Sequence, residues 1–129
     1  EEALALMARS AKGGLRDALG LLDQVSVLGR AEGTAIGRGD VLQFIGALEE
    51  DVLLGLADAV AERAAGNLLD RLQALSGQGV EAPRLLKNLL QHFRHLMIVK
   101  ACGAQASAEA LDLPEAYVGA LAAQAERFE

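Results

Sequence analysis

Two predicted helices meet in the stretch Lys12-Gly13-Gly14-Leu15-Arg16-Asp17-Ala18-Leu19, which runs on into Leu21-Leu22-Asp23-Gln24. The paired glycines favour the end of one helix, and the Leu and Ala spacing after them is typical of one face of the next. Asp17 suits the positive end of a helix, whereas Arg16 at that end is disfavoured by about 0.3–1 kcal/mol. An arginine beside free backbone N–H groups is a candidate anion site that a phosphate would suit. A solvated surface arginine is the plainer alternative.

The composition extends the helical prediction to the whole chain of 129 residues. Hydrophobic residues make up 52% of it and aromatic residues only 3%. The apolar residues are mostly Leu and Ala, which favour helices, and runs of Val, Ile, Thr and Tyr typical of strands are missing. We therefore predict an all-α fold.

Charge and cysteine content narrow the class of protein. The net charge of −6 argues against a main duplex-binding face and so disfavours a helix-turn-helix regulator. Cys102 is the single cysteine, which fits a reducing, cytoplasmic setting. No apolar run approaches the ~20 residues that a membrane helix needs. The helical pattern is already under way at Ala3 and Leu4, so we expect a piece of a longer protein.

A glycine-rich stretch predicts a division into two parts. Helices are expected over about 1–11 and 15–28, followed by a linker over 29–39 that holds four of the chain's 14 glycines. Asp40 is a candidate N-cap for a helix ending at Gly46, and further helices begin near Glu49, Asn67 and Pro83. After a loop through Ser107 and a short turn, the last helix begins at Pro114. The predicted boundaries are 1–28, 29–39 and 40–129.

The predicted helix over 83–100 is the longest and the most apolar. A helix that is apolar over more than one face is usually central in a bundle or part of an interface. Its candidate interface residues are Leu86, Leu90, Phe93 and Met97. A free-standing adaptor that binds partner helices through this surface is an alternative function.

Other candidate sites are weaker. His92 and His95 share one side of this helix, but a metal site needs further ligands, and polar residues on an amphipathic helix explain them better. Glu49-Glu50-Asp51 is explained by helix capping. The four serines have no Gly-x-Ser-x-Gly context, and the phosphate-loop motif Gly-x-x-x-x-Gly-Lys-Ser/Thr is absent. We expect no catalytic residue and no metal site within this chain.

The stretch from Gly13 to Gln24 resembles the sensor 2 helix of bacterial clamp-loader AAA+ ATPases, and within them the gamma/tau subunit family of DNA polymerase III. The preceding residues 2–11 are similar to the helix before that motif. The resemblance continues through Gly39-Asp40-Val41 to Gly46, through Gly79-Val80 to Leu90, and through Leu113-Pro114-Glu115 to Phe128.

This resemblance implies that residues 1–28 end an AAA+ lid and that residues 40–129 form a helical-bundle collar, the oligomerisation domain of the loader. Arg16 would hold the sensor 2 position toward the terminal phosphates of ATP, supported by the motif residues Gly13, Gly14, Leu15 and Asp17. ATP and Mg²⁺ belong to the parent protein, and none is expected for this chain alone, which should neither hydrolyse ATP nor bind DNA tightly. The implied partners are further copies of the subunit, delta and delta prime, with the sliding clamp and primed DNA contacted through the complex.

Overall fold

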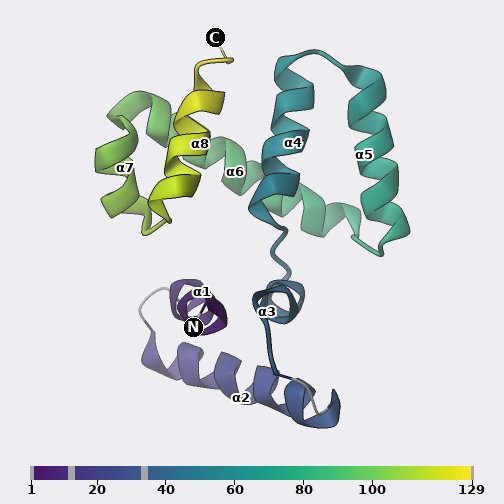
Figure 1. Cartoon of the computed structure of the whole chain (residues 1–129), viewed down its shortest axis with the longest axis vertical. Helices are drawn as coiled ribbons and strands as arrows, with labels where there is room; N and C mark the ends of the chain where they lie inside the picture. The colour runs from purple at the N-terminus through teal and green to yellow at the C-terminus, as the bar shows by residue number, and fades with distance from the viewer. Residues whose placement is uncertain (1, 12–13, 33–34, 129) are drawn as a thin grey trace. The chain divides into compact units, whose positions relative to one another are not determined.

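A computed structural model describes residues 2–11, 14–32 and 35–128, and for residues 28–32 it describes the backbone alone. It confirms the all-α prediction. Within these residues the chain forms helices and no strand (Figure 1). It divides into two compact units, an N-terminal unit over Glu1–Ala47 and a C-terminal unit over Leu48–Glu129. The helices are α1 (Glu2–Ser10), α2 (Leu15–Glu32), α3 (Arg38–Ile45), α4 (Glu50–Ala61), α5 (Ala65–Gly77), α6 (Ala82–Cys102), α7 (Ala104–Leu111) and α8 (Glu115–Ala125).

Three helices share the core of the N-terminal unit. Met7 from α1, Val25 from α2 and Val41 from α3 are buried together, with Ile36 and Ile45 packed against them. Figure 1 shows α1 and α3 side by side along α2. Each helix therefore contributes one buried apolar side chain to this small core.

The predicted linker differs from the structure at both of its ends. Helix α2 continues through Glu32, because a single glycine such as Gly29 costs a helix only about 1 kcal/mol relative to alanine. Helix α3 begins at Arg38, and the Gly37 N–H donates a 2.8 Å hydrogen bond to Oδ2 of Asp40. Asp40 thus lies in the first turn and is not the N-cap. Because Val41 is buried against α1 and α2, α3 belongs to the N-terminal unit, and the compact units divide after Ala47.

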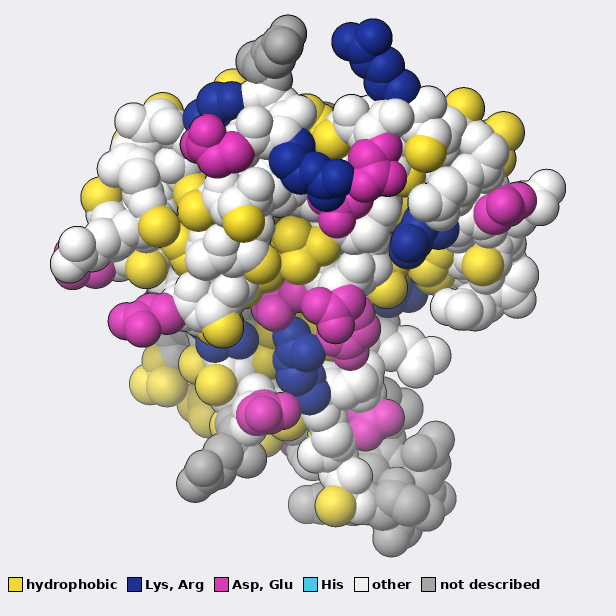
Figure 2. Space-filling model, turned by 45° about the horizontal axis from the view of Figure 1, so that its top comes forward, with side chains coloured by type: hydrophobic (Ala, Val, Ile, Leu, Met, Phe, Trp, Pro, Cys, Tyr) yellow, Lys and Arg dark blue, Asp and Glu magenta, His cyan; other side chains and the backbone are white. Residues whose placement is uncertain are grey.

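Helix α8 lies at the centre of the C-terminal unit. Its Tyr117, Val118 and Leu121 are buried with Leu96 and Val99 of α6, and α4 and α7 also pack against α8. Figure 1 shows α4 and α5 as an antiparallel pair and α7 beside α8 at the other end of α6. Figure 2 shows acidic, basic and hydrophobic side chains interspersed on the face that it draws.

Two further boundaries in this unit differ from the sequence expectation. Residues 104–111 form α7 where a loop through Ser107 was expected. Ser107 is buried, and its hydroxyl donates a 2.6 Å hydrogen bond to the Gly103 carbonyl one turn earlier, which satisfies the hydroxyl within the helix. Helix α5 begins at Ala65, two residues before Asn67, after a turn at Arg63, which has a φ of 55°. No helix within the described residues has the length and apolarity to cross a membrane.

Candidate functional site

The first turn of α2 is fixed by close backbone packing at Gly14. The Gly14 N–H donates to the Ala11 carbonyl, and the Ala18 N–H donates to the Gly14 carbonyl, each at 2.9 Å. A Cβ at Gly14 would lie 2.8 Å from Oδ2 of Asp17 and 3.2 Å from the Ala11 oxygen. Only glycine fits here without a shift of its neighbours. Gly13, the other half of the pair, lies outside the described residues.

Arg16 projects from this first turn as an exposed side chain. Within the part of the chain that the structure describes, no hydrogen bond or ion pair holds its guanidinium. Leu15 beside it is 74% exposed, and Leu19 and Leu22 on the same helix face are also exposed. Of this predicted apolar face only Val25 enters the core. The arrangement leaves a cation and first-turn N–H groups open to an anionic ligand.

Three of the four predicted interface residues form an exposed row on α6, which we call the α6 stripe. Leu86, Leu90 and Met97 are 59%, 64% and 72% exposed, and their spacing places them along one side of the helix. Phe93 does not belong to the α6 stripe. It is half-buried, and its ring meets the Phe128 ring edge-on with centroids 5.8 Å apart.

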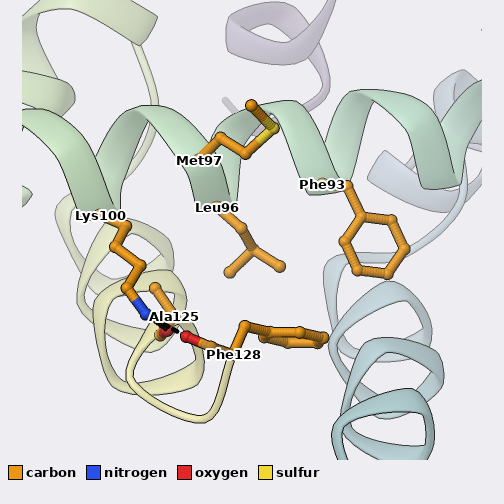
Figure 3. A pocket seen from close by; sticks show the side chains of 6 residues that line it. All are labelled: Phe93, Leu96, Met97, Lys100, Ala125 and Phe128. Carbon is orange, nitrogen blue, oxygen red and sulfur yellow. Dashed lines mark hydrogen bonds between the residues drawn. The ribbon is translucent and has the colours of Figure 1, made fainter.

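A shallow groove of about 190 Å³ lies between α6 and the end of α8 (Figure 3). Lys100 closes one end of it, because its Nζ donates to the carbonyls of Ala125 and Phe128. In Figure 3, the Met97 side chain leaves one side of α6, whereas the Leu96 and Phe93 side chains leave the other. The groove is lined by Phe93, Leu96, Met97, Lys100, Ala125 and Phe128.

Beneath this surface a buried polar network joins α6 to α8 and α4. His92 is 1% exposed; its Nε2 lies 2.7 Å from Oε1 of Gln124 and its Nδ1 lies 2.9 Å from the Tyr117 hydroxyl. The Gln124 amide nitrogen donates to the Leu54 carbonyl and to Oδ1 of Asp58. The Gln124 oxygen must therefore accept, which makes His92 Nε2 the protonated nitrogen and Nδ1 the acceptor of the Tyr117 O–H.

The network ends at the surface in two ion pairs. Arg127 donates to Asp58 at 2.6 Å and to Glu62 at 2.5 Å, and these neighbours raise the pKa of its guanidinium. Burial lowers the pKa of His92, and the opposing effects of Gln124 and Asp58 are smaller. Burial also raises the pKa of Tyr117. His92 is therefore held neutral as a structural hydrogen-bonding group.

This geometry leaves no ring nitrogen of His92 for a metal ion. Both ring nitrogens of His92 are engaged, and His95 Nε2 lies 2.7 Å from the side-chain nitrogen of Gln91. Among the described residues, no group of three His, Cys, Asp or Glu side chains could hold a metal ion.

Sequence reasoning missed the partners of His92. Tyr117 and Gln124 stand four residues before and three residues after Leu121, on the same helix face. Two polar residues in register with a core leucine were the available signal, since buried polar groups are normally hydrogen-bonded.

Comparisons with known proteins give related results for the two parts of the chain. The family model described as DNA polymerase III subunits gamma and tau domain III matches residues 36–129, and the model described as DNA polymerase III clamp loader subunit, ATPase lid domain matches residues 1–31. DNA polymerase III subunit tau of Bacillus subtilis is 29% identical over 118 residues, 91% of this chain and 20% of the relative. The Escherichia coli subunit tau is 31% identical over 98 residues, 76% of this chain and 15% of the relative. The chain thus spans a fifth or less of these relatives, and no solved structure matches it significantly.

Proposed function

The chain belongs to the family of DNA polymerase III gamma and tau subunits, and from that membership we propose that it joins the end of an ATPase lid to the collar of a clamp loader. The lid part would span 1–28 and the collar 40–129, although α3, where the collar would begin, packs within the compact N-terminal unit. The observation that carries the collar function is the α6 stripe, where three large apolar side chains are left exposed on the longest helix. Large apolar side chains that are exposed together on a surface often mark a protein–protein contact.

The proposed partners are other subunits of the same complex: further copies of this chain, delta and delta prime. The complete loader would use ATP to place a sliding clamp on primed DNA during replication, in the cytoplasm. The net charge of −6 suits a scaffold that stands away from the DNA phosphates.

For Arg16 we propose the sensor 2 role in the longer protein. Its exposed guanidinium beside first-turn N–H groups fits the terminal phosphates of ATP, held together with Mg²⁺ by a nucleotide-binding domain outside this chain. ATP bound there would supply the phosphoryl group for hydrolysis, and cations nearby would stabilise the negative charge on that group during its transfer. Arg16 would then link nucleotide binding to the position of the lid.

The collar function is tested by association of the 129-residue chain with itself and with the other loader subunits, measured by light scattering after size exclusion. Leu86→Asp should weaken association, because it places a charge in the contact. Leu69→Asp is the matched control, since Leu69 on α5 is also 59% exposed. A wild-type chain that stays monomeric and ignores all loader subunits would contradict the collar and favour the adaptor alternative.

The Arg16 role is tested in the longer protein by the rate of ATP-dependent clamp loading. Arg16→Ala should lower that rate by about tenfold or more, and Arg16→Lys should restore only part of it, because lysine lacks the planar fork of donors. Arg71→Ala, which removes an exposed arginine of α5, should leave the rate unchanged. Loading at the wild-type rate by Arg16→Ala would show that Arg16 does not sense the nucleotide.

A further inference from the structure

The α6 stripe lies on a helix of one charge sign. Helix α6 contains Arg84, Lys87, Arg94 and Lys100 and no acidic residue, although the chain as a whole carries a net charge of −6. Lys87 and Arg94 are exposed, and they stand three residues before and four residues after Leu90. At that spacing they are neighbours of Leu90 on the helix surface. The stripe is therefore an apolar row bordered along one side by positive charge.

A second surface of the C-terminal unit has the complementary character. A groove of about 380 Å³ lies between α7 and α8, and the charged residues among its lining side chains, Glu109 and Glu115, are both acidic. Ala104, Ala108 and Gly119 give it low walls that allow a close approach. We call it the α7–α8 groove, and its lining is Ala104, Gln105, Ala108, Glu109, Glu115, Val118 and Gly119.

These two surfaces face away from each other. Gly119 stands two residues from both Tyr117 and Leu121, which are buried in the core shared with α6. Leu90 stands two residues before His92, which bonds to α8. Because residues two apart on a helix point to nearly opposite sides, Leu90 at the middle of the stripe lies on the side of α6 away from α8, and Gly119 lies on the side of α8 away from α6. One chain can therefore use both surfaces at once.

We propose that the α6 stripe of one copy docks into the α7–α8 groove of a second copy of this chain. The inference rests on the proposed collar function and names the two surfaces that would meet. The apolar row would enter the groove while Lys87 and Arg94 face its glutamates, a pairing of opposite charges that sets orientation. Since the two surfaces differ, the contact is heterologous and repeats from copy to copy, as in a ring, instead of closing at a dimer.

The test uses one variant for each surface. Leu90→Asp disables the stripe. Gly119→Gln obstructs the groove without disturbing the fold, because a Cβ at Gly119 would meet no atom within 4 Å. The matched controls are Leu69→Asp and Gly66→Gln on α5, where Leu69 is 59% exposed and a Cβ at Gly66 also meets nothing within 4 Å. Circular dichroism checks that each variant is folded.

Self-association is measured by sedimentation velocity of the whole chain. Each surface variant should associate about tenfold or more weakly than wild type, the controls should match wild type, and added salt should weaken wild-type association. An equimolar mixture of Leu90→Asp and Gly119→Gln should form a heterodimer and nothing larger, because one intact stripe and one intact groove remain.

Other outcomes separate this inference from the collar function. Wild-type association by Gly119→Gln would overturn the groove as the partner of the stripe while leaving the collar function standing. A wild-type chain that binds other loader subunits but not itself would overturn the inference in the same way. A chain that does neither would contradict the proposed function itself.

Discussion

Gln124→Leu tests whether the buried network stabilises the C-terminal unit. Leucine has nearly the same volume as glutamine, so the packing of α8 is largely kept. The change removes the acceptor 2.7 Å from His92 Nε2 and the donor to the Leu54 carbonyl and Asp58. His92 Nε2 is then buried against an apolar side chain, which costs about 1–3 kcal/mol. The free energy of unfolding of this unit should fall by that amount.

The assay is urea unfolding followed by tyrosine fluorescence. The chain has one tyrosine and no tryptophan, so the signal comes from Tyr117 alone, which bonds to His92. It therefore reports on the C-terminal unit without interference from the N-terminal unit. The dependence of stability on urea should keep its slope, because the surface exposed on unfolding is unchanged.

A control and a double variant sharpen the result. Gln91→Leu removes an exposed glutamine that bonds only to His95 among the described residues, and it should change stability by less than about 0.5 kcal/mol. His92→Phe combined with Gln124→Leu should cost less than the sum of the single changes by about 1 kcal/mol, because the two partners are removed together. Wild-type stability of Gln124→Leu at an unchanged slope would refute the reasoning.

Two further predictions concern pH and glycine. Burial is the main cause that lowers the pKa of both His92 and His95 below 6.5, so the unfolded chain binds more protons below that pH. Stability measured by Tyr117 fluorescence should therefore fall as pH drops below about 6.5, by at most about 1.4 kcal/mol per pH unit for each histidine, and a rise on acidification would contradict this. Gly14→Ala should destabilise the N-terminal unit, whereas Gly20→Ala, which meets no atom within 4 Å, should stabilise α2 by about 0.5–1 kcal/mol. Thermal unfolding by circular dichroism measures both, and the same sign for the two changes would contradict it.

The helices follow from local sequence because their causes act within about one turn. Gly46 adopts a φ of 72° where α3 ends, and Gly103 adopts a φ of 82° where α6 ends, as their positions predict. Pro83 stands in the first turn of α6, where its missing N–H is harmless. The errors also have local causes: Gly29 was too weak a signal to end α2, and Ser107 bonds to a carbonyl within its own helix.

What the sequence by itself determined is the all-α class, most helix ends, and the motif around Arg16 that the family models match. Only the tertiary structure decided which of several similar apolar residues are buried. Leu90 and Leu96 belong to the same helix and the same residue type, yet one is exposed and the other buried, because α8 covers a single side of α6. His92 became a buried structural group through Gln124, 32 residues away. Periodicity describes the sides of a helix, but burial depends on which distant segment covers each side.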